Sequence, residues 1–107
     1  MSVRVYLDDE ALTAQLIGDL DHHAAKSIRE EIDEAAGRAR VKQMILDFRD
    51  VTFMDSSGIG LVMGRWALMK ELGGELFVEN MPGHIQKVMK LAGISQLTNT
   101  IAGGREK

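Results

Sequence analysis

The chain has 107 residues, 45% of them hydrophobic and 27% charged, which is enough for one globular domain but leaves no room for a second. The net charge of −3 leaves no basic surface for nucleic-acid phosphates, so we expect no direct contact with DNA or RNA. Cysteine, an export signature and any apolar run of ~20 residues are all absent, so we expect a cytoplasmic protein without disulfides or thiolate metal sites.

Two strands that form a hairpin are predicted at the beginning of the chain. Apolar residues alternate with more polar ones over residues 3–7 and again over residues 12–16, which is the period of half-buried strands. The polar residues 8–10 between them predict a turn. Asp21 follows the second strand and is a good N-cap for the helix that comes next.

Two helices and a central strand are predicted in the middle of the chain. The first helix is amphipathic and spans residues 22–36, where Gly37 supplies a C-terminal stop. Residues 44–48 form a nearly continuous apolar run, typical of a central strand that is covered on both faces. The second helix is expected at about residues 57–72, and its core-facing stripe is expected to consist of Ile59, Val62, Met63, Trp66 and Met69.

The remaining elements complete an α/β fold. Residues 76–78 predict a buried strand, and a third helix follows the turn at residues 80–83, with Ile85, Val88, Met89 and Ala92 inward. A short last strand is expected at residues 97–101. Because helices join the later strands, we expect a single domain over residues 1–107, with an ordered core at about 3–101. Its mixed, mostly parallel sheet opens with an antiparallel hairpin and has helices packed against it.

One segment, Met54–Gly60 with the sequence MDSSGIG, combines residues that suit a chemical switch. A serine hydroxyl at a helix N-cap accepts a hydrogen bond from an unpaired amide, and only one residue can hold that position. The other hydroxyl is then free to accept a phosphate, which the amides and dipole of a helix N-terminus tolerate. On position alone, a purely structural cap and a phosphorylation site both remain open.

A resemblance to a known family covers about residues 3–101. Residues 53–60, FMDSSGIG, resemble the signature of STAS domains, and residues 18–24, GDLDHHA, resemble the family's segment between a strand and the first helix. Gly64-Arg65 and residues 73–75 stand at family-like places. The branch that the chain resembles most is that of the anti-sigma factor antagonists of sporulation. The resemblance implies a STAS-like fold and a binding module that is not an enzyme and needs no cofactor.

The resemblance also implies a partner-switching mechanism in transcription regulation. The unphosphorylated antagonist binds an anti-sigma factor that is also an ATP-bound serine kinase, and this binding releases the sigma factor. The kinase phosphorylates the first serine after the aspartate, which is Ser56 here, and a serine phosphatase reverses the reaction. The phosphate adds about −1.5 to −2 charges to the contact surface. No contact with nucleic acid or membrane is implied, and the free protein is expected to be monomeric.

Roles for the other site residues follow from the same resemblance. Ser57 is expected to be the structural cap, and Asp55 and Asp21 to sharpen the repulsion of a phosphate. Gly58 and Gly60 are expected to let the partner's backbone approach closely. The expected partner-binding residues are Asp21, His22, Asp55, Ser56, Ser57, Gly58, Ile59 and Gly60, and no residue is expected to be catalytic or to bind a metal. The chain departs from its relatives at residues 102–104, where Ala-Gly-Gly replaces the beginning of a further helix.

Two alternatives are kept. One is a STAS-domain scaffold or regulator in another stress-response or sensor pathway, which would share the same motif. The other is a serine hydrolase with one of the three histidines as its base, although Met54 stands where a nucleophile elbow needs glycine before Ser56. Nucleotide binding is disfavoured, because the glycines of residues 58–64 depart from the dinucleotide fingerprint and no Walker lysine follows.

Overall fold

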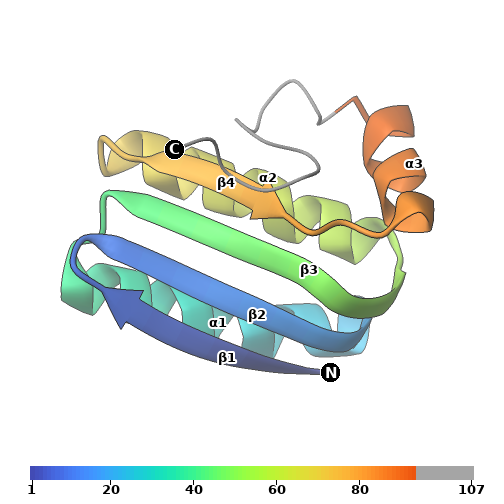
Figure 1. Cartoon of the computed structure of the whole chain (residues 1–107), viewed down its shortest axis with the longest axis horizontal. Helices are drawn as coiled ribbons and strands as arrows, with labels where there is room; N and C mark the ends of the chain where they lie inside the picture. Colours follow the sequence, from blue (N-terminus) through green and yellow to red (C-terminus); the bar gives the residue numbers. More distant parts are fainter. Residues whose placement is uncertain (94–107) are drawn as a thin grey trace.

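A four-stranded sheet with two long helices on one face forms the frame of the protein in this computed structural model, which describes residues 1–93 (Figure 1). In chain order the elements are β1 (Ser2–Asp8), β2 (Ala11–Leu20), α1 (His22–Ala39), β3 (Gln43–Met54), α2 (Ser56–Glu71), β4 (Glu75–Glu79) and α3 (Gly83–Leu91). The expected strand at residues 97–101 and the end of the chain lie outside the described residues. No helix within residues 1–93 is both long and apolar enough to cross a membrane.

The sheet has the mixed topology that the sequence predicts. Its spatial order is β1-β2-β3-β4, with β1 antiparallel to β2 and with β2, β3 and β4 parallel to one another. Parallel neighbours need a crossover, and α1 and α2 supply the two crossovers. In Figure 1 both helices lie behind the sheet, where α1 packs on β1 and β2 while α2 packs on β3 and β4. The hairpin and the parallel crossovers are therefore confirmed.

One hydrophobic core fills the space between the sheet and the two helices. Alternate residues of β2 and β3 enter it from the sheet, which is the two-residue period of a strand. Ile28 and Ile32 enter it from α1, and Leu61, Val62 and Met69 enter it from α2. Burial of these side chains stabilises the fold and fixes how α1 and α2 lie against the sheet.

The predicted core stripe of α2 is confirmed for Val62 and Met69 but not for its other three members. Ile59 and Trp66 are only half-buried, and Met63 is 43% exposed. The buried face instead carries Gly58, Leu61, Val62, Arg65 and Met69. A hydropathy pattern does not place a glycine and an arginine in a core, and for that reason the sequence does not reveal that Gly58 and Arg65 lie on the buried face.

Two smaller predictions about the helices also need correction. Helix α1 continues past Gly37 to Ala39, since Ala36 is buried in the core and Arg40 takes the left-handed cap conformation with φ of 51°. In α3, Ile85 and Met89 are buried as predicted, whereas Ala92 is exposed at the helix end.

Candidate functional site

The candidate site lies where two neighbouring parallel strands end. The last residue of β2, Leu20, is paired with the last residue of β3, Met54. The next amide, that of Asp55, donates a hydrogen bond to the carbonyl oxygen of Leu20 at 3.3 Å. Because α1 and α2 follow directly, their N-termini lie side by side at one edge of the sheet, and residues far apart in the sequence meet there.

An aspartate caps each of these two helices. Oδ1 of Asp21 accepts hydrogen bonds from the backbone N–H groups of His23 and Ala24, both at 3.1 Å. Oδ1 of Asp55 accepts one from the N–H of Ser57 at 2.8 Å. The Asp21 cap is confirmed, but the prediction that Ser57 caps α2 is wrong. Aspartate and serine are comparable N-caps, and the register of β3 places the aspartate in that position.

Because Asp55 is the N-cap of α2, neither Ser56 nor Ser57 caps the helix. Ser56 is the first residue of α2 and is exposed to solvent, while Ser57 is half-buried. Neither hydroxyl forms a hydrogen bond to any other part of residues 1–93. The site thus presents one accessible, unbonded hydroxyl at a helix N-terminus, where an added anion is favourable.

Gly58 and Gly60 have different environments. Gly58 is buried, and a Cβ there would overlap Cγ of Met54 and lie 3.1 Å from Cδ2 of Leu20. Glycine at this position thus allows α2 to approach its own sheet, which corrects the expectation that it serves a partner's approach. Gly60 is exposed with nothing within 4 Å of a Cβ, and Ile59 is half-buried against the core.

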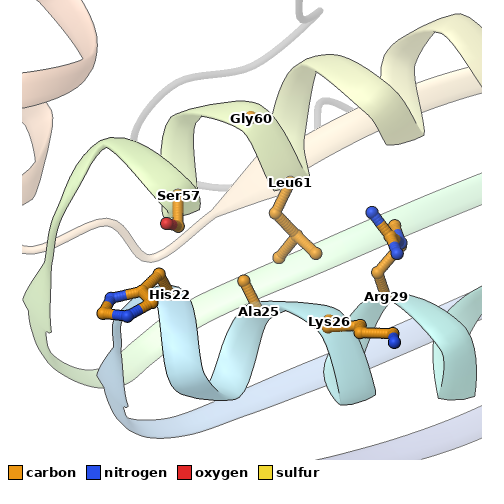
Figure 2. A pocket seen from close by; sticks show the side chains of 7 residues that line it. All are labelled: His22, Ala25, Lys26, Arg29, Ser57, Gly60 and Leu61. Carbon is orange, nitrogen blue, oxygen red and sulfur yellow. The ribbon is translucent and has the colours of Figure 1, made fainter.

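A groove of about 340 Å³ runs between the N-terminal halves of α1 and α2. Figure 2 shows Leu61 pointing from α2 toward α1, where Ala25 lies opposite, and the side chain of Arg29 reaching from α1 toward α2. The groove is lined by His22, Ala25, Lys26 and Arg29 of α1 and by Ser57, Gly60 and Leu61 of α2. Of the predicted site residues, His22, Ser57 and Gly60 meet here, while Asp21 and Asp55 lie at the two caps.

Deeper between the helices is a charged pair that sequence reasoning missed. Arg65 of α2 is 6% exposed, and its Nε lies 2.9 Å from Oδ1 of Asp33 on α1. Burial lowers the pKa of Arg65, and burial raises the pKa of Asp33 despite the opposing effect of Arg65 and Arg29. The pair joins α1 to α2. The only hint of it in the sequence is a charged residue, Arg65, within the otherwise apolar second helix.

The histidines do not form the arrangement that a serine hydrolase needs. The rings of His22 and His23 lie against each other with centroids 4.1 Å apart, and Nε2 of His84 lies 3.2 Å from the carbonyl oxygen of Thr52. Within residues 1–93 no histidine nitrogen is hydrogen-bonded to Ser56 or Ser57. In the same part of the chain, no group of three or more metal-ligating side chains comes together.

Comparisons with known proteins agree with this geometry. The STAS domain model matches residues 2–103. An anti-sigma F factor antagonist of Paenibacillus polymyxa is 33% identical over 86 residues, which are 80% of this chain and 74% of that protein. The structure of the anti-sigma factor antagonist SpoIIAA in its unphosphorylated form is similar with a TM-score of 0.84 and 30% identity, and it covers 97% of this chain and 90% of its own.

A second solved structure is that of the Bacillus cell fate determinant SpoIIAA in its phosphorylated form. It is 30% identical with a TM-score of 0.76, and the match covers 97% of this chain and 93% of that one. The family model spans nearly the whole sequence, and the fold is that of the solved SpoIIAA structures. This chain therefore belongs to the STAS domain family.

Proposed function

We propose that this protein is an anti-sigma factor antagonist that binds an anti-sigma factor serine kinase through the start of α2 and is switched off by phosphorylation of Ser56. The observation that carries the proposal is the exposed hydroxyl of Ser56, which neither caps the helix nor bonds elsewhere in residues 1–93. It is supported by the likeness to SpoIIAA, an anti-sigma factor antagonist with solved unphosphorylated and phosphorylated forms.

Accessibility favours Ser56 over Ser57 as the phosphoacceptor. A kinase must bring the γ-phosphate of ATP in line with the attacking hydroxyl, so the acceptor has to be open to an incoming protein. Ser56 is exposed, whereas Ser57 is half-buried and lines the groove between the helices. The carboxylate of Asp55 leaves Ser56 free by taking the cap position itself.

The phosphate changes docking while leaving the fold intact. At the first residue of α2, the free amides and the dipole of the helix favour an anion, so the modified protein stays folded. In the interface, the same group adds about −1.5 to −2 charges next to the carboxylate of Asp55, the preceding residue. Like charges across an interface cost several kcal/mol, and ~5.5 kcal/mol takes a complex from almost always bound to almost never bound.

The remaining parts of the switch are a phosphatase and a compartment that holds ATP. A serine phosphatase restores the binding form, and the kinase supplies the nucleotide, so the antagonist itself needs no cofactor. We propose a cytoplasmic location and a monomeric free state, in which the surface around Ser56 is available to the kinase.

The test is a binding titration of the wild-type protein and its variants with an anti-sigma F factor kinase and ATP analogue. Ser56→Ala is expected to bind as tightly as the unmodified wild type, whereas Ser56→Asp is expected to bind at least about tenfold more weakly. Ser57→Ala removes a groove-lining hydroxyl without adding charge and is expected to weaken binding far less than Ser56→Asp. Equal binding by Ser56→Asp and wild type, or no binding by either, would contradict the proposal.

A further inference from the structure

The groove between α1 and α2 has a basic wall, although the chain as a whole carries a net charge of −3. Its ionisable lining residues are His22, Lys26 and Arg29, all from α1, and no aspartate or glutamate lines it. Figure 2 shows Arg29 and His22 at opposite ends, with Leu61 and Ala25 between them. The groove therefore combines an apolar middle with basic side chains along one side.

The charges packed around the groove do not neutralise this wall. Deeper between the helices, Asp33 is paired with Arg65 and also interacts with Arg29, while the carboxylates of Asp21 and Asp55 lie at the helix caps and do not line the groove. Lys26 forms no ion pair within the described part of the chain. Asp21 is held as the cap of α1 by two backbone amides.

We propose that this groove receives an acidic segment of the anti-sigma factor partner, with its carboxylates beside Lys26 and Arg29 and an apolar side chain over Leu61. The inference rests on the proposed function, because it assigns the chemistry of the same partner. Ser57, which lines the groove, directly follows Ser56 in α2, so a protein seated on Ser56 lies next to the groove. Opposite charges across an interface speed association and fix its register.

This assignment supplies the negative charge that a phosphate on Ser56 has to repel. An acidic segment entering the groove passes the beginning of α2, where the phosphate would stand. The phosphate also lowers the positive potential of the wall that attracts the segment. A single electrostatic contact thus explains both attraction in the unmodified state and release in the modified state.

The first test compares two charge reversals with the same effect on net charge, Lys26→Glu in the groove and Arg4→Glu outside it. Arg4 is exposed and lies between Val3 and Val5, which pack on the core, so its side chain points to the opposite face of the sheet. Association with the kinase is measured by stopped flow at about 0.05 M and about 0.5 M salt.

We expect Lys26→Glu to associate about tenfold more slowly than wild type at low salt, with the difference shrinking to about twofold at high salt, and Arg4→Glu to stay within about twofold throughout. If wild type binds the kinase but Lys26→Glu and Arg4→Glu behave alike, the groove assignment is wrong and the proposed function stands. If wild type does not bind, the proposed function itself fails. Far-UV circular dichroism of both variants checks that they are folded.

The second test identifies the occupant directly. Carbodiimide joins an amine to a carboxylate with loss of water and no spacer, so Lys26 in the complex is expected to couple to an aspartate or glutamate of the kinase. Mass spectrometry of the cross-linked peptides reads the pair. Cross-links from other lysines only, or saturable binding of ATP or inorganic phosphate in the groove of the free protein, would overturn the assignment to an acidic protein segment.

Discussion

Residues 21–24 and residues 55–58 are two solutions to the same structural task. Each segment follows the end of a parallel strand, and each begins a helix with an aspartate cap. The first reads Asp-His-His-Ala and the second Asp-Ser-Ser-Gly. Because the aspartate alone satisfies the cap in both, the two serines of the second segment are not needed for the fold, which marks them as candidates for chemistry.

The fourth residue of each segment shows how closely the helix approaches the sheet. Ala24 in α1 is half-buried and packs against the core with its methyl group. Gly58 in α2 is buried with Met54 and Leu20 in the space that a methyl group would need. The beginning of α2 is therefore pressed more tightly on the strand ends than that of α1, which fixes the position of Ser56.

The largest expected effect on stability comes from placing a methyl group at position 58, where α2 lies closest to the strand ends. Gly58→Ala is expected to lower the free energy of unfolding by about 2 kcal/mol, because the cost of overpacking exceeds the helix propensity that alanine gains. The reverse change in the other segment, Ala24→Gly, should cost about 1 kcal/mol from propensity. Urea denaturation measures both. A Gly58→Ala variant as stable as wild type would show that the close approach at α2 is absent.

A smaller effect tests the shared feature, the aspartate caps. Asp21→Ala and Asp55→Ala should each lose about 1 kcal/mol of stability, because each leaves helix amides without an acceptor. Ser57→Ala, which removes a hydroxyl with no cap role, should change stability by less than about 0.5 kcal/mol. Thermal denaturation compares the three variants. If Ser57→Ala lost as much stability as Asp55→Ala, Ser57 would also have to be a cap of α2.

The last prediction concerns the ionisation of the pair that joins the two helices. Arg65→Met leaves the carboxylate of Asp33 without its partner, so it destabilises the fold near neutral pH, and it removes the charge that lowers the pKa of Asp33. The pKa of Asp33, already raised above 3.8 by burial, should therefore rise further.

The sign of the pH dependence follows from that shift. A carboxyl group whose pKa is higher in the folded state favours folding below the unfolded value of 3.8, and this contribution is lost as pH rises through the folded pKa. Nuclear magnetic resonance titration of Asp33 in wild type and in Arg65→Met measures it. An unchanged or lower pKa in the variant would mean that Arg65 does not act on Asp33.

The sequence predicts the sheet topology, the Asp21 cap and the exposed serine. Each of these follows from a local pattern: the two-residue period of the strands, the helices between them, and the short polar segments at the beginning of each helix. It does not predict which of Asp55, Ser56 and Ser57 caps α2, because these side chains are comparable caps and the register of β3 decides among them. It predicts Val62 and Met69 on the buried face of α2 but not Gly58 and Arg65, because a buried glycine and a buried arginine do not follow the hydropathy pattern. The groove depends on which faces of α1 and α2 meet. These helices are far apart in the sequence, so local patterns do not predict the contact.

The assignment of Ser56 as the phosphoacceptor is tested by mapping the phosphate after incubation with the kinase and ATP. Wild type, Ser56→Ala and Ser57→Ala are treated together and analysed by tandem mass spectrometry of the peptide that contains residues 53–60. We predict one phosphate on Ser56 in wild type and in Ser57→Ala, and none in Ser56→Ala. A phosphate on Ser57 in the wild-type protein, or no phosphate on either serine, would contradict the claim.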